Sequence, residues 1–216
     1  MRPRRRIPLW IPLALALACN ADAPPPQSAQ PSAQERIHAG PHDVAVLDLG
    51  ELGSVRIELL PELAPKSVES FEQLAASGFY DGTTFHRVIP GFMIQGGDPL
   101  TKNKDPRDDG RGGPDYRLQD EFSDYPHVRG TVSLANSGRH SSGSQFFIVQ
   151  QDSPHLNGAY TVIGRVVSGM ETVDAVAKLP IDLYGRYGPP DRPYPQSATL
   201  RSLRIERAGA GVADAN

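Results

Sequence analysis

Short stretches in which apolar residues recur at every second position characterise the chain from residue 44 onward. In the stretch 54–60, Val55, Ile57 and Leu59 alternate with polar residues, which is typical of a strand with one buried face. A similar stretch at 44–49 precedes it, and the glycine-containing segment between the two predicts a β-hairpin. Further strands are predicted at 131–135, 145–150 and 161–166, and a last one holds Leu200, Leu203 and Ile205.

Two segments follow the helical period instead. Pro65 suits a first helical turn, and Val68 and Phe71 then fall on one face of the predicted helix. A second helix is predicted at 170–179, where the following proline stops it, and the segment 182–196, rich in Gly, Pro and Tyr, is predicted to be a loop. Two helices among many short strands predict an all-β fold, a closed barrel capped at its ends by the two α-helices.

The segment 1–19 is predicted to be a secretory signal. Four arginines precede an apolar run from Ile7 to Ala18, which is too short to span a membrane, and Cys19, the only cysteine, follows. Residues 16–19 resemble a bacterial lipobox, which predicts a lipid on Cys19, whereas residues 16–18 also fit a cleavage site that releases a soluble protein. Both alternatives predict an exported, periplasmic protein whose contact with a membrane, if any, is a lipid on Cys19.

The composition changes along the chain and defines its domains. Residues 20–41 are rich in Pro, Ala, Gln and Ser and predict a disordered tether, whereas 42–207 form one domain of ordinary size and 208–216 a flexible tail. The formal net charge of −3 gives no basic footprint, so no nucleic-acid partner is expected. We expect a monomer.

The stretch 85–98 carries the strongest candidate chemistry. Arg87 lies there among large apolar residues, although arginine is rarely buried without a partner. The pattern therefore favours a strand at the edge of a groove, with the guanidinium of Arg87 reaching into the groove. Pro90-Gly91 predicts a turn, and Gly96-Gly97 indicates backbone with unusual dihedral angles or a close approach.

This stretch resembles the signature segment of cyclophilin-type peptidyl-prolyl cis-trans isomerases. Segments 130–136, 143–148 and 156–164 resemble the same family in the same order, so the resemblance covers roughly residues 43–207. It implies an eight-stranded antiparallel barrel and an isomerase that acts on proline-containing polypeptides. Together with the predicted signal, the chain resembles a bacterial, exported member of the family.

The resemblance also implies which residues act. The implied catalytic residues are Arg87, Phe92 and Gln95, and the implied substrate-binding residues are Met93, Ala135, Asn136, Gln145, Phe147, His155, Leu156 and Tyr160. The apolar members would form a cup for the proline ring, the alternative being plain barrel core, and the amides would orient the peptide or satisfy neighbouring loops. Phe146, which alternates with Phe147, is predicted to be core. His155 and Tyr160 depart from the best-known eukaryotic members, which carry Trp and His, yet both keep an aromatic ring with a polar tip.

The sequence shows no apparatus for covalent or metal chemistry, because it lacks a His-Glu-x-x-His spacing, a Gly-x-Ser-x-Gly elbow and a pair of cysteines. We therefore predict no metal and no cofactor. Rotation about an Xaa-Pro bond needs neither, since its obstacle is amide resonance. In the twisted amide the proline nitrogen regains its lone pair, which the guanidinium of Arg87 would bind better than the planar amide. The alternative for Arg87 is a salt bridge or a plain surface position.

Three interpretations of function follow from these residues. The first is an isomerase that assists the folding of exported proteins, and the second is a non-catalytic proline-peptide binding module or chaperone. The third is a metal or calcium protein, because residues 105–110, which begin inside the insertion-like segment 99–109, resemble a calcium loop. Arg107 stands there at a position that should be Asp or Asn, which weakens the third. His86 points away from Arg87 along the strand, which favours a structural role.

Overall fold

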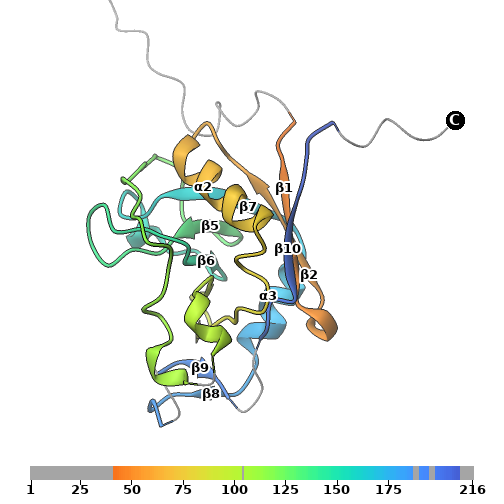
Figure 1. Ribbon diagram of the computed structural model, residues 1–216, viewed down its shortest axis with the longest axis vertical. Helices are drawn as coiled ribbons and strands as arrows, with labels where there is room; N and C mark the ends of the chain where they lie inside the picture. Colours follow the sequence, from red (N-terminus) through yellow and green to blue (C-terminus); the bar gives the residue numbers. More distant parts are fainter. Residues whose placement is uncertain (1–40, 104, 187–189, 195–197, 210–216) are drawn as a thin grey trace, which may run out of the picture. The chain divides into compact units, whose positions relative to one another are not determined.

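The computed structural model describes residues 41–103, 105–186, 190–194 and 198–209. An eight-stranded antiparallel sheet dominates this part, in the order β10-β1-β2-β7-β5-β6-β4-β3 (Figure 1). Its strands are β1 (Val44–Asp48), β2 (Ser54–Leu59), β3 (Arg87–Ile89), β4 (Met93–Gly96), β5 (Thr131–Leu134), β6 (Phe146–Val149), β7 (Val162–Ser168) and β10 (Ser202–Glu206). The predicted signal with Cys19, most of the tether and most of the tail lie outside the described residues.

The sheet is an open half-barrel that turns through 196°, so the predicted closed barrel is wrong. Strands β10 and β3 end the sheet and do not pair with each other, although the segments beside them, 82–85 and 198–200, share one bridge between Thr84 and Thr199 and three backbone hydrogen bonds. The free edge of β3 is used elsewhere, because the backbone N–H of Val88 donates to the carbonyl of Asp191 at 2.7 Å. Strand β3 has only three residues, so once Val88 is bonded to Asp191, few backbone groups of β3 are left to pair with β10.

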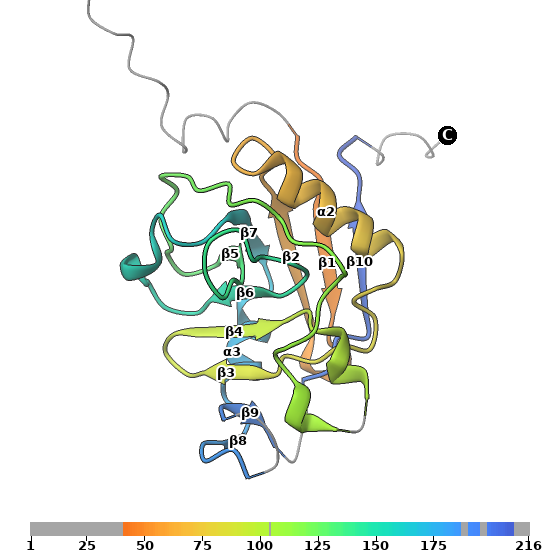
Figure 2. The same ribbon diagram turned by 60° about the vertical axis from the view of Figure 1, so that its left-hand side comes forward.

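A two-stranded hairpin that the sequence does not predict occupies this edge. It consists of β8 (Ile181–Asp182) and β9 (Arg192–Pro193), both inside or beside the segment predicted to be a loop. Strand β9 contacts β3 (Figure 2). Strands of two residues leave no detectable period in the sequence, and this is why the hairpin was not predicted.

Both predicted helices are confirmed. Helix α2 (Pro65–Ala76) begins with its proline, buries Val68 and Phe71 and packs against β10. Helix α3 (Met170–Ala177) ends two residues earlier than predicted and contacts β2, β3 and β4. No helix within the described ranges is long and apolar enough to cross a membrane.

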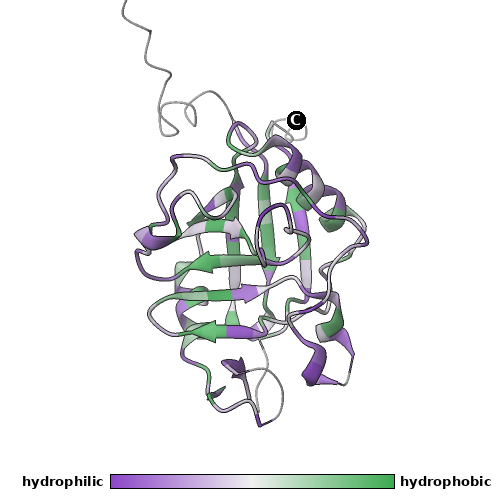
Figure 3. Cartoon of the chain, turned by 90° about the vertical axis from the view of Figure 1, so that its left-hand side faces the viewer, coloured by the Kyte–Doolittle hydropathy of each residue, from purple (hydrophilic) through white to green (hydrophobic). Residues whose placement is uncertain are grey.

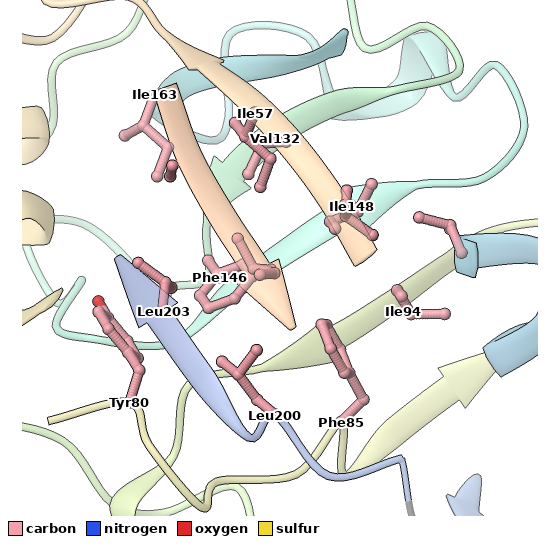
Figure 4. Close-up of a cluster of buried hydrophobic side chains, with 14 of the residues drawn as sticks. Ile57, Tyr80, Phe85, Ile94, Val132, Phe146, Ile148, Ile163, Leu200 and Leu203 are labelled. Carbon is pink, nitrogen blue, oxygen red and sulfur yellow. The ribbon is translucent and has the colours of Figure 1, made fainter. Parts of the chain in front are cut away.

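The core fills the inner face of the half-barrel. Hydrophobic residues concentrate in the strands, whereas the loops are mostly hydrophilic (Figure 3). Val88 lies opposite Ile94, Ile94 opposite Ile148 and Ile148 opposite Val132, and all four are at most 1% exposed. Figure 4 shows side chains of this inner face converging with those of other strands. Strand alternation then requires the intervening residues of the same four strands to face outward.

The insertion-like segment is folded around one buried carboxylate. Asp98 is fully buried and accepts hydrogen bonds from the backbone N–H groups of Leu100 (2.8 Å), Gly110 (2.5 Å) and Gly112 (3.1 Å). The preceding Gly97 has φ +83°, and a Cβ there would lie 2.6 Å from the carbonyl oxygen of Ser144. The predicted need for glycine at this point is therefore confirmed. Within the segment lie η2 (Pro99–Lys102) and η3 (Pro106–Asp108), two short 3-10 helices.

His86 lies beneath this segment and is only 3% exposed. Burial lowers the pKa of His86 to about 4, while the nearby Asp98 carboxylate opposes this shift. An unfolded histidine has a pKa near 6.5, so between about pH 6.5 and pH 4 the unfolded chain binds a proton that the folded chain does not. Stability conferred by neutral His86 is thus complete above this window and is lost as the pH falls through it.

We predict that the free energy of unfolding falls by about 3 kcal/mol through His86 alone between pH 6.5 and pH 4. Urea unfolding at several pH values, compared between the unmodified chain and His86→Gln, isolates this contribution because every other titrating group is shared. The variant should show a shallower decline with falling pH. Equal slopes in the two proteins would contradict the prediction.

Candidate active site

One row of residues on the outer face of the sheet crosses strands β3, β4, β6 and β5. Arg87 lies directly opposite Gln95, Gln95 opposite Phe147, and Phe147 opposite Ser133. Directly opposed residues project from the same face of a sheet. The strand register therefore brings together two predicted catalytic residues, Arg87 and Gln95, and the predicted binding residue Phe147.

The side chain of Arg87 is exposed at the outer end of this row. Among the described residues, no carboxylate lies within ion-pair distance of its guanidinium. The sequence left a salt bridge open as an alternative role for Arg87, but its guanidinium has no carboxylate partner in this part of the chain. Its five N–H donors remain available to a molecule that binds over the row.

An apolar cluster shares Phe147 with this row. Its buried members are Met93, Phe147, Val149 and Leu156, and the half-buried residues around them are Ile89, Phe92, Ala135 and Tyr160. None of them belongs to the interior cluster, where Phe146 is fully buried as predicted. We call these eight residues the cup. Val149 and Ile89 were not predicted as site residues. Each lies directly opposite the predicted residue Met93, and each lies two residues along its strand from another predicted residue, Phe147 or Arg87.

Aromatic contacts hold the wall of the cup. The ring of Tyr160 meets that of Phe147 edge-on at 5.2 Å between centroids, with an interplanar angle of 87°. The ring of His155 lies 5.4 Å from that of Phe92, and the His155 side chain is exposed. His155 and Leu156 belong to η4 (Pro154–Leu156), a 3-10 helix of one turn. The two positions that depart from the eukaryotic pattern therefore both place rings against the cup.

The predicted amides form short hydrogen-bond chains along the rim. Gln95 Nε2 donates to Gln145 Oε1 at 2.9 Å, and Gln145 Nε2 donates to the carbonyl of Gly112 at 2.9 Å. Asn136 Nδ2 donates to the carbonyl of Ala159 at 3.0 Å. The bonds to Gly112 and Ala159 satisfy neighbouring loops, which is one of the two roles that the sequence left open for these amides. Because each amide nitrogen carries two N–H groups, the same bonds also leave donors for a bound peptide.

His127 supports the cup from behind and was missed in the sequence. It is 1% exposed, stacks on Phe147 at 6.1 Å and 19°, and its Nε2 lies 3.0 Å from Ser133 Oγ. Its Nδ1 lies 3.1 Å from Asn157 Oδ1, and burial lowers the pKa of the imidazole. A neutral ring packed in this way fixes the orientation of Phe147. No motif marks His127, because a lone histidine after a proline carries no periodic signal.

The site offers an exposed cation, free amide donors and an apolar cup within one outer face. Among the residues with described positions, no group of three or more His, Cys, Asp or Glu side chains is arranged to hold a metal ion. Arg107, which weakens the predicted calcium loop, pairs with Asp105 at 2.7 Å. Such a site can bind an extended peptide with one apolar ring in the cup and can hydrogen-bond its backbone.

Comparisons with known proteins agree with this architecture. The family model described as cyclophilin type peptidyl-prolyl cis-trans isomerase matches residues 44–208. A probable peptidyl-prolyl cis-trans isomerase of Brucella suis is 49% identical over 146 residues, which cover 65% of this chain and 74% of the relative. Peptidyl-prolyl cis-trans isomerase B of Bacillus subtilis is 50% identical over 119 residues, covering 54% of this chain and 78% of that protein.

A solved structure has the same fold. The crystal structure of a Cryptosporidium parvum cyclophilin type peptidyl-prolyl cis-trans isomerase, in the presence of the dipeptide Ala-Pro, matches with a TM-score of 0.66 and 30% identity. The match covers 76% of this chain and 98% of that chain.

The antiparallel half-barrel and the apolar cup on its outer face agree with the family model and with the isomerases to which the chain is similar. The chain belongs to the cyclophilin type peptidyl-prolyl cis-trans isomerase family. It is therefore an enzyme that interconverts the cis and trans forms of Xaa-Pro peptide bonds.

Proposed function

We propose that this isomerase acts on Xaa-Pro bonds of exported polypeptides and assists their folding, with the proline ring in the cup and Arg87 as the catalytic donor. The observation that carries the proposal is the register that aligns Arg87, Gln95 and Phe147 on one outer face. The Ala-Pro dipeptide present with the Cryptosporidium parvum relative supports a proline-containing ligand.

The rotational barrier of the Xaa-Pro bond determines how much the site must stabilise the transition state. Rotation about an Xaa-Pro bond is opposed by about 18–20 kcal/mol, which corresponds to a spontaneous rate on the order of 0.01 per second. Lowering this barrier by about 5–7 kcal/mol gives turnover of about 10² to 10³ per second. Hydrogen bonds aimed at the twisted amide and a partly desolvated cup are effects of this size.

Arg87 is suited to bind the twisted state selectively. In the planar amide the proline nitrogen shares its lone pair with the carbonyl group and is a poor acceptor. In the twisted amide the lone pair is localised, so a guanidinium donor binds it more strongly. Only an interaction that strengthens in the transition state accelerates the step. Gln95, which lies directly opposite Arg87 in the sheet, and Phe92 would position the peptide.

The test of this function is the refolding of an exported protein whose slow phase is limited by proline isomerisation. That phase takes tens of seconds without a catalyst. Catalytic amounts of the mature chain should shorten it in proportion to enzyme concentration. A binding module or chaperone would change the yield of folded protein and leave the rate of the slow phase unchanged, which would contradict the proposal.

Export and anchoring rest on the N-terminal sequence. The basic start, the apolar run and the position of Cys19 support a periplasmic lipoprotein, with residues 20–41 as the tether between lipid and domain. One acyl chain anchors a protein marginally, whereas several anchor it well.

We predict that Cys19→Ser moves the protein from the membrane fraction to the soluble periplasmic fraction without lowering its isomerase activity, because the tether separates the lipid from the domain. Fractionation and mass spectrometry of the mature chain measure this. Ser28→Ala, a similar change inside the tether, serves as the control and should keep the membrane location. A mature chain whose Cys19 is free of lipid, or that begins after Cys19, would show that the lipid prediction is wrong.

A further inference from the structure

Strand β3 has one edge that no other strand of the eight-stranded sheet covers. The strand has three residues, and Arg87 is the first of them. Because Arg87 has no carboxylate within ion-pair distance in the described part of the chain, no ion pair there fixes the direction of its guanidinium. The backbone of β3 therefore sets where this guanidinium lies, and a contact that holds the free edge of β3 also holds Arg87.

The β8–β9 hairpin holds this free edge (Figure 2). The N–H of Val88 donates to the carbonyl of Asp191 at 2.7 Å, and the N–H of Asp191 donates to the carbonyl of Asp182 at 3.0 Å. Asp191 has φ +66°, a left-handed conformation that residues with a side chain rarely adopt. Such a conformation persists only where the surrounding contacts enforce it. The carbonyl that Val88 binds is therefore directed by contacts that the hairpin makes with its neighbours.

Arg192, the first residue of β9, makes a contact of this kind directly after Asp191. Its Nε donates to Oδ2 of Asp109 at 2.6 Å, and the side chains of Arg192 and Asp109 are only 18% and 1% exposed. Hydrogen bonds between two ionised groups are about twice as strong as neutral ones. Asp109 ends the segment 99–109, which is folded around the buried Asp98. The ion pair thus fastens β9 to a segment that is itself held in place.

We propose that Arg192 and Asp109 are positioning residues of the isomerase. Through the carbonyl of Asp191, their ion pair holds Val88 in place and keeps the neighbouring Arg87 directed at the proline nitrogen. The proposal rests on the proposed role of Arg87 as the catalytic donor. A donor must meet the twisted nitrogen at hydrogen-bond distance and in the right direction, so even a small shift of β3 weakens the interaction.

The first test separates kcat from KM. Arg192→Ala should lower kcat for an Xaa-Pro peptide by about five- to twentyfold, because a misplacement of about 1 Å can cost about a hundredfold. This loss is smaller than that expected for removing Arg87, since the donor is misplaced and not absent. KM should change by less than about twofold, because most of the cup lies on β4, β6 and η4 and not on β3. An unchanged kcat would overturn the proposal.

A double-mutant cycle tests whether Arg192 acts through Arg87. In the Arg87→Ala background no guanidinium is left to misplace, so Arg192→Ala should lower kcat further by less than about twofold. A merely structural loss would lower kcat by the same factor in both backgrounds. Equal factors would therefore show that Arg192 does not position Arg87.

Hydrogen exchange of the Val88 amide reports the position of the free edge directly. This amide should exchange at least about tenfold faster in Arg192→Ala than in the unmodified enzyme, because the carbonyl that protects it is released. Arg165→Ala is the matched control, since Arg165 Nε donates to Glu58 Oε2 at 2.5 Å between β7 and β2, several strands away from β3. The control should leave kcat and the exchange of Val88 unchanged. The same loss of kcat in Arg165→Ala would overturn the proposal.

Arg192→Ala leaves the carboxylate of Asp109 buried without a cation, which can unfold the hairpin. Two milder variants keep the test decisive in that case. Arg192→Lys retains the cation and should keep kcat within about threefold of the unmodified enzyme. Arg192→Gln combined with Asp109→Asn leaves no buried charge and retains a neutral hydrogen bond, so kcat should fall by about two- to fivefold, and only where Arg87 is present. An equal fall in the Arg87→Ala background would contradict the positioning role.

The outcomes also separate this proposal from the function on which it rests. If Arg87→Ala lowers kcat and the changes at Arg192 do not, the positioning role fails and the proposed role of Arg87 stands. If Arg87→Ala itself keeps normal turnover, the role of Arg87 as donor fails, and the positioning role fails with it.

Discussion

Replacing Arg87 by alanine is expected to lower kcat/KM for an Xaa-Pro peptide by about two to three decades while the fold survives. This loss corresponds to about 2.7–4 kcal/mol, the range seen when one donor to a developing charge or lone pair is removed. The fold should survive because Arg87 is exposed on a three-residue edge strand and has no ion-pair partner within the described part of the chain.

The mechanism also predicts how this loss divides between binding and turnover. The planar amide nitrogen offers little to a hydrogen-bond donor, so the dissociation constant of a non-reacting peptide should change much less than kcat. Exchange spectroscopy at saturating peptide measures kcat, and calorimetry measures the affinity. Arg87→Lys keeps the charge without the planar fork of donors, so it should recover only part of the activity.

Arg56→Ala is a suitable control, since Arg56 is a surface arginine of strand β2 that pairs with Glu206 at 2.7 Å. Its kcat should match that of the unmodified enzyme. Near-normal turnover in Arg87→Ala, or an equal loss of binding and turnover, would mean that the site does not use a donor to the twisted nitrogen. A site that mainly holds peptides would then be the better interpretation.

Much of the strand arrangement could be predicted because the signal is local. In β2, alternation fixes which residues are buried, and in β6 it separates Phe146, in the interior, from Phe147, on the outer face. The main sheet has the eight strands that the family resemblance implied. The two helices, the turn at Pro90-Gly91 and the strands with a visible period are as expected from the sequence itself. Each depends on residues close in the sequence, whose period or turn chemistry is visible directly.

The closure of the barrel could not be predicted from such signals. Whether β3 pairs with β10 depends on competition for the free edge of β3, and the carbonyl of Asp191 takes its N–H group. That competitor comes from a hairpin of two-residue strands about a hundred residues later in the chain. The edge contact is a tertiary effect, and neither the strand nor its partner carries a pattern that reveals it.

The site residues also divide into those with a local sequence signal and those that depend on tertiary contacts. Arg87, Gln95 and Phe147 could be predicted because they lie in segments with strong local composition and a family resemblance. His127 could not, because its importance comes from stacking on Phe147 and from its contact with Ser133, both of which depend on how the loop before β5 folds back. His127 is part of the site because of its packing in the folded chain, which no local sequence pattern indicates.

Phe147→Ala is expected to raise KM for a proline peptide by about tenfold or more and to lower the free energy of unfolding by about 3 kcal/mol. Phe147 is 4% exposed, forms the wall of the cup, and contacts both Tyr160 and His127. The proline ring loses its apolar surface equally in the planar and twisted states, so KM should rise more than kcat falls. The stability cost lies at the low end for a phenylalanine because Phe147 belongs to the small cluster of the cup and not to the large interior cluster.

The adjacent phenylalanines provide a matched test of this division of faces. Phe146 is fully buried in the interior and packs edge-on against Phe85 at 6.0 Å, whereas Phe147 faces the cup. With the milder change to leucine, Phe146→Leu should lower the unfolding midpoint in urea and leave KM unchanged, while Phe147→Leu should raise KM with the smaller effect on stability. We expect both proteins to remain folded, so that KM can be measured on each. An unchanged KM in Phe147→Leu and Phe147→Ala alike would place the proline ring outside the cup, because both changes remove apolar surface from its wall.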